Sequence, residues 1–232
     1  MDDPKKQYVL SLGGSLVVPN GGIDTKFLSR FNTFIRKQIS SKKRRFFIVV
    51  GGGATTRHYQ DAARTVHGKI EDEDLDWIGI HATRLNAHLV RVIFVDIAHS
   101  HVIKHYEIIR KASEPVVIAA GWKPGWSTDY DAIMLCQDYG VRTAINMSNV
   151  DQVYDKDPKK YPDAKPIVET SWTRYRKMVG DKWIPGMNIP FDPIASKLAA
   201  ELGVTVKILN GKNLDNLAKA LDGKKFVGTT IT

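Results

Sequence analysis

The run Phe46-Phe47-Ile48-Val49-Val50, which leads directly into Gly51-Gly52-Gly53, decides the fold class of this 232-residue chain. Five consecutive apolar residues predict a strand that is buried on both faces, as parallel strands usually are. The three glycines predict a tight turn into a helix that begins near Ala54. A strand, a glycine turn and a helix in succession are typical of α/β folds with a parallel sheet.

The same succession recurs along the rest of the chain. Another apolar strand, residues 7–12, runs into Gly13-Gly14, and Asp24 stands where the following helix needs an N-cap. Further strands are expected over residues 115–119, 141–147, 204–209 and 226–231, and further helices over residues 75–94, 128–139, 194–202 and 214–221. The alternation therefore predicts an α/β fold with a largely parallel sheet.

The domain organisation follows from length and from the absence of linkers. Residues 1–232 suit one large domain, and a soft boundary between two lobes falls near residues 121–129. Residues 150–166 are rich in Asp, Lys and Pro, which predicts a protruding hairpin or a long loop.

The composition bears on where the protein acts and on the role of its single cysteine. The sequence has no run of 18 apolar residues and no basic-then-apolar leader, so we expect a cytoplasmic protein that does not enter membranes. The single cysteine, Cys136, excludes an intrachain disulfide and a cysteine-based zinc site, and it falls on an apolar stretch that we expect to be core.

The formal net charge of +9 raises the question of polyanion binding. The charge lies in short clusters beside predicted turns, namely 42–45, 159–160 and 224–225. None of them alternates basic and aromatic residues as a single-strand binding face does. We interpret the clusters as solvated surface and rank nucleic-acid binding lowest among the functions considered.

The two glycine clusters point to a phosphate. Both follow a strand and precede a helix, so their backbone N–H groups can approach a phosphate at a helix N-terminus. Ligands of open α/β sheets bind at this edge. Neither cluster matches the Walker A pattern or GxGxxG. Arg57, one turn after Gly53, could reach back to the same phosphate, although spacing alone fits a surface arginine equally well.

Carboxylates near predicted helix starts are the second ingredient of phosphoryl transfer. Thr128-Asp129 and Asp192-Pro193 each open a helix, where capping is the simpler interpretation for both aspartates. The polar loop that follows Asn149 contains Tyr154 and could enclose a nucleotide or be a hydrated hairpin. The residues themselves therefore lead to an α/β phosphate-binding protein, most simply a kinase.

Taken together and in this order, the motifs resemble the archaeal-type uridylate (UMP) kinases of the amino acid kinase superfamily, nearly from end to end. The carriers are Leu12-Gly13-Gly14-Ser15, Val50-Gly51-Gly52-Gly53 with Arg57, Asp76-Trp77-Ile78-Gly79-Ile80, Thr83-Arg84-Leu85-Asn86-Ala87, Pro124-Gly125-Trp126-Ser127-Thr128-Asp129, Asn149-Val150-Asp151 with Tyr154 and Asp157-Pro158-Lys159-Lys160, and Phe191-Asp192-Pro193-Ile194-Ala195. The resemblance implies a three-layer αβα sandwich around a mainly parallel sheet, commonly assembled into hexamers.

The resemblance also implies roles for individual residues. Catalysis of direct in-line transfer from MgATP to UMP falls to Gly13, Gly14, Asp192 and Lys197. The N-terminal part, up to about residue 120, would bind the acceptor, and the C-terminal part would bind ATP. The UMP residues are Gly52, Gly53, Arg57, Asp76, Thr128 and Asp129. The ATP residues are Ser15, Asn149, Tyr154, Asp157 and Lys159. Mg²⁺ would be held mainly through the ATP phosphates, with no protein ligand assigned.

The sequence departs from the family pattern at several positions. Many relatives have Lys where this chain has Ser11, although the archaeal-type branch also lacks that Lys. The archaeal-type branch often has Lys where this chain has Ala54. Another cation must then act on the phosphoryl group, and Lys197 and Lys123 are the candidates. The turn that contains Lys123 is also unusually bulky, because Trp122 and Trp126 flank it.

Two alternatives remain open from the sequence. One is a kinase of the same superfamily with a different acceptor, such as acetylglutamate, carbamate, aspartate or isopentenyl phosphate. The other is a nucleotide-binding storage or regulatory protein, because the segments Leu209-Asn210-Gly211 and Gly228-Thr229 also resemble molybdenum storage proteins.

Overall fold

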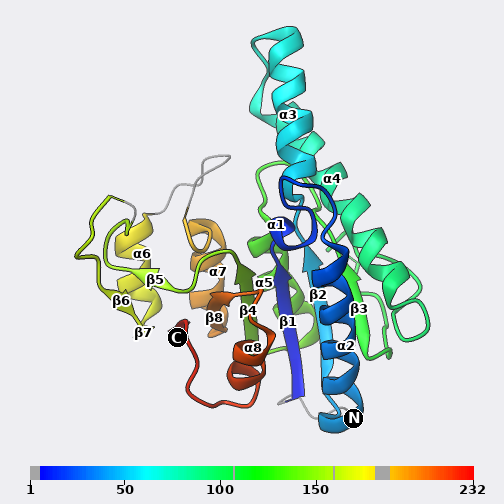
Figure 1. The fold of residues 1–232 in the computed structure, drawn as a ribbon, viewed down its shortest axis with the longest axis vertical. Coiled ribbons are helices and arrows are strands. Elements are labelled where there is room, and N and C mark those ends of the chain that lie inside the picture. Colours follow the sequence, from blue (N-terminus) through cyan, green and yellow to red (C-terminus); the bar gives the residue numbers. More distant parts are fainter. Residues whose placement is uncertain (1–5, 107, 159, 181–188) are drawn as a thin grey trace.

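A computed structural model describes residues 6–106, 108–158, 160–180 and 189–232, and its ribbon is shown in Figure 1. A seven-stranded sheet has the order β3-β2-β1-β4-β8-β9-β7. Its strands are β1 (Gln7–Leu12), β2 (Arg45–Val50), β3 (Val116–Ala119), β4 (Thr143–Ser148), β7 (Glu169–Thr170), β8 (Thr205–Asn210) and β9 (Thr229–Ile231). All neighbouring strands of this sheet are parallel except β8 and β9.

Helices cover both faces of the sheet. They are α1 (Gly14–Val17), α2 (Thr25–Lys42), α3 (Gly53–His67), α4 (Asp72–Ile93), α5 (Thr128–Tyr139), α6 (Trp172–Val179), α7 (Pro193–Leu202) and α8 (Leu214–Leu221). The apolar sides of α2, α4 and α8 pack in one core, and those of α5, α6 and α7 pack in a second core on the opposite face. The predicted three-layer α/β arrangement is confirmed.

Strand β2 is apolar from Phe46 to Val50 because it faces both cores. Along β2, Phe46, Ile48 and Val50 enter the core beneath α2 and α4. Phe47 and Val49 enter the opposite core beneath α5. Successive strand residues point to opposite faces, so a strand covered by helices on both faces is apolar at successive positions.

The predicted elements lie close to the observed ones. Helices α5 and α8 match their predictions from end to end, and β9 begins three residues later than predicted, at Thr229. Helix α4 begins at Asp72, before the predicted start, because three acidic residues in its first turn suit the positive end of the helix dipole. Of the two possibilities expected after β4, a hairpin or a long loop, the structure has the hairpin: β5 (Val153–Tyr154) pairs antiparallel with β6 (Pro166–Ile167). The sequence reading missed α1, α6 and β7.

Helix caps were predicted with mixed success. Asp24 accepts a hydrogen bond from the Phe27 N–H at 2.9 Å and caps α2, as predicted. The expectation that Thr128-Asp129 caps α5 is wrong, because the Ser127 side chain accepts the Tyr130 N–H at 3.2 Å. Asp129 is thereby free for contacts elsewhere.

Two further sequence expectations concern the core and membranes. Cys136 is a buried free thiol of α5, and burial raises its pKa, which confirms it as a core residue. Among the described residues, no helix is both long and apolar enough to cross a membrane.

Candidate active site

The two glycine loops touch each other at the carboxyl edge of the sheet. They leave neighbouring parallel strands in register, because Leu12 pairs with Val50. A Cβ added to Gly14 would lie 2.0 Å from the backbone nitrogen of Gly53 and 2.6 Å from the carbonyl carbon of Gly51. Gly53 also has a φ of +65°, which L side chains rarely adopt. Side chains at these positions would force the two loops apart.

Some N–H groups of the loops are used to build the site. Gly13 donates to the Met147 carbonyl at 2.8 Å, and Gly51 donates to the Leu12 carbonyl at 3.0 Å. Within the described ranges, the N–H groups of Gly14, Gly52 and Gly53 have no hydrogen-bond acceptor. These N–H groups lie next to the first turns of α1 and α3, where a phosphate oxygen finds both donors and a partial positive charge.

Helix α4 holds the second glycine loop through a residue to which the sequence reading gave no role. Asn86 is 3% exposed, and its side-chain amide donates to the carbonyls of both Gly51 and Gly52, each at 2.9 Å. A buried amide that bridges two successive carbonyls fixes the orientation of the intervening peptide. The only signal in the sequence was the position of Asn86 within the TRLNA segment.

The same helix holds the turn after β3. Thr83 accepts the Gly121 N–H at 2.9 Å, and Arg84 donates to the carbonyls of Gly121 at 3.2 Å and Trp122 at 2.8 Å. Asp76, near the start of α4, accepts the Gly125 N–H at 2.8 Å. Its pKa is raised because the carboxylate is partly withdrawn from water. Helix α4 therefore links the turn containing Lys123 to the second glycine loop.

Asp129 joins four elements behind the first glycine loop. Its Oδ1 accepts from Ser11 Oγ of β1 at 3.1 Å and from Asn146 Nδ2 of β4 at 3.0 Å. Its Oδ2 accepts the N–H of Asp192, at the start of α7, at 3.3 Å. Burial, and then the negative charge of Asp192, raise the pKa of Asp129 to about 7. As a whole residue, Asp129 is half-buried.

Asp192 is used differently from Asp129. Its side chain is 5% exposed and accepts the N–H groups of Ile194 at 2.6 Å and Ala195 at 2.8 Å, which confirms it as the N-cap of α7. Burial raises its pKa, against the stabilising effect of these hydrogen bonds. The resemblance gives the organising role to Asp192, whereas the hydrogen bonds that connect β1, β4 and α7 converge on Asp129.

The structure shows what surrounds each candidate cation. At the position of Ser11, where the resemblance led us to look for a lysine, the hydroxyl donates to Asp129 Oδ1. Lys123 places its ammonium over the rings of Trp122 and Trp126, at 4.1 and 4.5 Å from their centroids. Lys197 lies on α7, one turn after Asp192, and is exposed to solvent.

The remaining acceptor-side residues lie at the same edge. Arg57 extends from the first turns of α3, and its Nη2 donates to Asn20 Oδ1 at 2.9 Å. This contact ties the loop after α1 to the helix after the second glycine cluster. Thr128 is half-buried at the first position of α5, directly before Asp129.

The residues predicted to bind ATP fall on three segments. Ser15 lies in α1, and Asn149 follows β4, whose Ser148 Cα lies 3.5 Å from the place a Cβ of Gly13 would take. Tyr154 and Asp157 belong to the β5–β6 hairpin, which is fixed to β9 because Val153 donates its N–H to Thr229 Oγ1 at 2.9 Å. Lys159 lies outside the described residues. The structure brings Ser15 and Asn149 to the first glycine loop and leaves Tyr154 and Asp157 on the hairpin.

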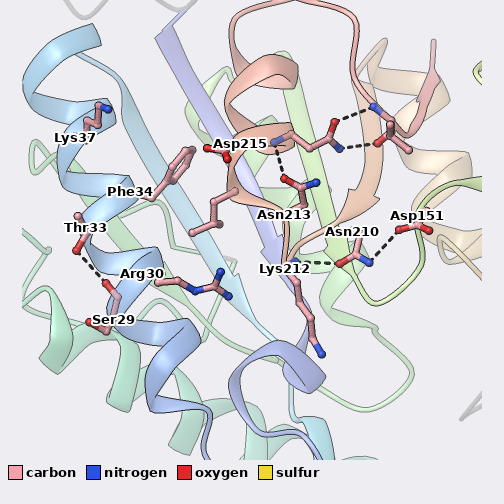
Figure 2. A pocket seen from close by; sticks show the side chains of 13 residues that line it. Ser29, Arg30, Thr33, Phe34, Lys37, Asp151, Asn210, Lys212, Asn213 and Asp215 are labelled. Carbon is pink, nitrogen blue, oxygen red and sulfur yellow. Dashed lines mark hydrogen bonds between the residues drawn. The ribbon is translucent and has the colours of Figure 1, made fainter.

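A cavity of about 800 Å³ lies beside this region, between α2 and the segment that follows β8. Figure 2 shows Arg30 on α2, and Asp151, Asn210 and Lys212 on the opposite wall, where Asn210 donates to Asp151 at 3.0 Å. None of the predicted site residues lines this cavity. The glycine residues of the two loops are not part of the lining of this cavity.

The arrangement of paired glycine loops on a three-layer fold agrees with comparisons to known proteins. The sequence pattern of the amino acid kinase family matches residues 6–210. The chain belongs to the amino acid kinase family. Members of this family at 30% identity or more include the uridylate kinase of Thermoplasma volcanium, which is 35% identical over 97% of this chain and 97% of its own length.

Further uridylate kinases are similar to this chain over nearly its whole length. The uridylate kinase of Methanospirillum hungatei is 32% identical, and the alignment covers 97% of this chain and 94% of that protein. The crystal structure of uridylate kinase from Archaeoglobus fulgidus superposes on this chain with a TM-score of 0.82 and a sequence identity of 31%. The superposition covers 97% of this chain and 99% of that protein. A UMP kinase structure from Bacillus anthracis, at 20% identity and a TM-score of 0.78, shares the fold.

Proposed function

We propose that this protein transfers the γ-phosphoryl group of ATP to UMP, giving UDP and ADP. The observation that carries the proposal is the backbone contact between Gly14 and Gly53, which joins two phosphate-binding loops at one sheet edge. Two loops in contact can hold two phosphates end to end, as direct transfer between two nucleotides requires. Amino acid kinase relatives named uridylate kinase, aligned over nearly the whole chain, support UMP as the acceptor.

In this proposal each glycine loop has its own phosphate. Gly13 and Gly14 cradle the migrating phosphoryl group, and Gly52 and Gly53 hold the phosphate of UMP together with Arg57. Backbone donors fixed in advance by Asn86 stabilise the charge that develops during transfer without reorganising. The same arrangement supports in-line attack by an oxygen of the UMP phosphate, with no covalent enzyme intermediate.

The nucleosides then lie on opposite sides of the loops. Asp76 binds the ribose of UMP, and Thr128 and Asp129 lie near the acceptor. The support is that Asp76 contacts the turn after β3 through Gly125, so ribose and turn share one wall. Ser15, Asn149, Tyr154, Asp157 and Lys159 bind ATP, and Asn149 follows the strand that adjoins Gly13.

Mg²⁺ fits this site as part of MgATP. Both side-chain oxygens of Asp129 and Oδ1 of Asp192 accept internal hydrogen bonds, and the described residues contain no group of three His, Cys, Asp or Glu placed to hold a metal. When bound through the ATP phosphates, the ion neutralises charge on the phosphoryl oxygens. Asp129 then orients the start of α7 and the first glycine loop around those phosphates.

Lys197 supplies the positive charge for which the first strand has no lysine. It lies on α7, whose first N–H groups are fixed by Asp192 and whose start is held by Asp129. Replacing Lys197 by Met should lower kcat at least 100-fold. If Lys123→Met has that effect instead and Lys197→Met does not, the lysine between the two tryptophans is the phosphoryl ligand.

The protein acts as a cytoplasmic homo-oligomer, with a hexamer as the expected assembly. Support comes from α4, which buries Ala87 and Val90 in the core. The same helix leaves the apolar side chains of Trp77, Leu85 and Val92 exposed to solvent. The exposed apolar residues recur at helical spacing, which suits contact with a second copy. Sedimentation velocity of the purified chain tests this, and a monomer at micromolar concentration would contradict it.

A coupled assay for ADP release decides the function. The chain is mixed with MgATP and UMP, CMP, acetylglutamate, carbamate, aspartate or isopentenyl phosphate in separate reactions. We expect stimulation by UMP to exceed that by every other acceptor at least tenfold. Stimulation by a different acceptor, or ATP binding without turnover on any of them, rules the proposal out.

A further inference from the structure

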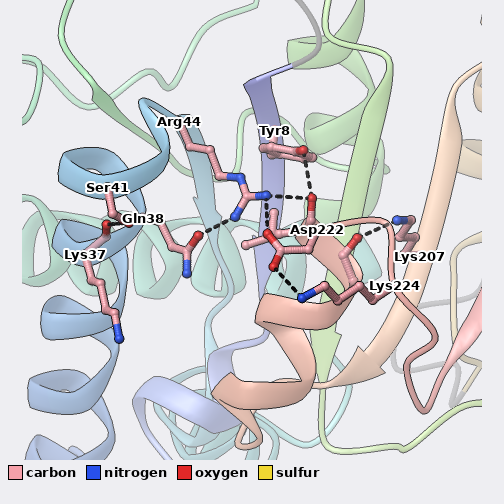
Figure 3. A network of polar contacts seen from close by, with 10 residues as sticks. Tyr8, Lys37, Gln38, Ser41, Arg44, Lys207, Asp222 and Lys224 are labelled. Atoms are coloured by element: carbon pink, nitrogen blue, oxygen red, sulfur yellow. Dashed lines mark hydrogen bonds and ion pairs between the residues drawn. The ribbon is translucent and has the colours of Figure 1, made fainter.

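Two basic runs that lie far apart in the sequence meet at the amino edge of the sheet. Arg44, at the start of β2, and Asp222, at the end of α8, are 178 residues apart and form an ion pair of 2.7 Å. Figure 3 shows the Arg44 guanidinium directed at Asp222, with Lys224 on the other side of the same carboxylate. The clusters 42–45 and 224–225, interpreted from sequence as separate solvated patches, are therefore one surface.

Arg44 is the fixed centre of this surface. Its side chain is 9% exposed, and its Nη2 donates to the Leu221 carbonyl at 2.8 Å as well as to Asp222. Its Nη1 donates to Gln38, and its guanidinium lies over the ring of Tyr8, 5.6 Å from the centroid. Arg44 and Asp222 neutralise each other, and the hydrogen bond from Arg44 lowers the pKa of Asp222, so the carboxylate stays charged near neutral pH.

A hollow of about 450 Å³ opens beside this pair and is lined by three lysines, Lys6, Lys42 and Lys224. Lys224 lies 3.7 Å from Oδ2 of Asp222, whereas Arg44 donates to Oδ1 of the same carboxylate. Among the described residues, Lys6 and Lys42 have no carboxylate within ion-pair distance. The hollow therefore has four cations and one carboxylate around a volume that suits a small molecule.

The hollow is separate from the candidate active site. Tyr8 lies at the start of β1, whereas Gly13 follows its end, and the strand between them extends roughly 17 Å at about 3.3 Å per residue. In Figure 1 the N-terminal end of β1 and the end of α2 lie together at the bottom of the molecule, away from α1 and α3. A ligand in the hollow cannot touch either glycine loop.

We propose that this hollow binds an oligophosphate group, either free or as the triphosphate of a nucleotide, at a second site distinct from the kinase site. Lysine ammonium groups bind phosphates as mobile point charges with three donors each. Three lysines in excess of the neutralised Arg44–Asp222 pair match a chain of linked phosphates better than they match one phosphate. The rigid Arg44 network holds β1, β2 and α8 in place, so the lysines surround a preformed floor.

Lysine footprinting tests the proposal without depending on kinase activity. The full chain is acetylated with a limiting amount of an N-hydroxysuccinimide ester in EDTA, with and without inorganic tripolyphosphate, and each lysine is quantified by mass spectrometry. We expect tripolyphosphate to slow acetylation of Lys42 and Lys224 at least threefold, while the exposed Lys69 and Lys104 remain unchanged. Equal slowing at all four lysines, or no slowing at Lys42 and Lys224, overturns the proposal.

Charge-matched double variants test the site by affinity. Lys42→Gln with Lys224→Gln should weaken tripolyphosphate binding, measured by titration calorimetry, at least tenfold, and Lys69→Gln with Lys104→Gln should change it less than twofold. Thermal melts of both variants show whether they remain folded. The proposal fails if the two variants weaken binding equally.

The nature of the ligand is decided by further arms of the footprint. If ATP protects Lys42 and Lys224 at a concentration at least tenfold below that of tripolyphosphate, the site is assigned to a nucleotide. If ATP and tripolyphosphate protect at equal concentrations, the site is assigned to the phosphate chain alone. Inorganic phosphate should protect at least tenfold more weakly than tripolyphosphate. Protection by a single-stranded RNA oligonucleotide at lower concentration than either would replace the proposal by a nucleic-acid surface.

Discussion

Ser11 donates a hydrogen bond from its hydroxyl to Oδ1 of Asp129 at 3.1 Å. This contact stabilises the charged form of Asp129, whereas burial and the charge of Asp192 favour the neutral form. The pKa of about 7 results from this opposition and places the titration of the group near neutral pH. A serine at this position therefore tunes the carboxyl that holds the site together, where a lysine would bring a positive charge.

Replacing Ser11 by Ala should shift the acid limb of the pH–rate profile upward. The variant loses a donor to the carboxylate, so the pKa of Asp129 rises further. A hydrogen bond to a charged group contributes on the order of 1.5 kcal/mol, which corresponds to about one pH unit. The measurement is kcat between pH 5.5 and 9, with Ser40→Ala on the exposed side of α2 as the control. An unshifted profile would show that Asp129 does not control the rate.

The stability of the Asp129→Asn variant relative to the wild type should increase as the pH rises from 5 to 8. The folded-state pKa of Asp129, about 7, exceeds its ordinary value of 3.8, so the folded protein binds the proton more tightly than the unfolded chain does. Stability is therefore lost as pH rises through this window, and an amide does not titrate. The difference in Tm between variant and wild type, measured at pH 5, 6, 7 and 8, should increase from pH 5 to 7 and level off towards pH 8. A difference that is independent of pH contradicts the raised pKa.

Gly14→Ala should abolish activity while leaving most of the fold intact. The new Cβ would lie 2.0 Å from the Gly53 nitrogen, so the loops must separate. Displacing phosphate donors by about 1 Å costs roughly 100-fold in rate, and we expect kcat/KM to fall at least that much. Gly21→Ala is the matched control, since nothing lies within 4 Å of a Cβ there. Equal activities of the two variants would mean that the loop contact is irrelevant to catalysis.

Asn86→Ala should impair UMP use without changing any residue that is proposed to contact substrate. Two buried hydrogen bonds to Gly51 and Gly52 are lost, and their carbonyls are left unpaired. At about 1 kcal/mol each, kcat/KM for UMP should fall roughly 10- to 100-fold. Initial rates at varied UMP, beside Asn32→Ala on α2, provide the measurement. If the KM for ATP rises and that for UMP does not, the second glycine loop holds the other nucleotide.

The sequence by itself determined most of the helices and strands, and the two glycine clusters at which we propose that phosphates bind. All five residues from Phe46 to Val50 are apolar, so both faces of the strand that they form had to be buried. Asp24 and Asp192 signalled helix starts through contacts that span only a few residues. The glycine clusters were visible because local backbone geometry and residue type are directly linked.

Only the tertiary structure decided which distant groups meet. Asp129 was read as a possible helix cap, but the sheet order β1–β4 placed Ser11 and Asn146 against it, from 118 and 17 residues away. The contacts of Asn86 with Gly52 and of Arg44 with Asp222 were likewise not predicted from the sequence, since they join residues that are 34 and 178 positions apart. Local patterns record how each segment buries its own side chains. Hydrogen bonds and charges between segments depend on the order in which strands pair, and that order is fixed only when the whole core packs.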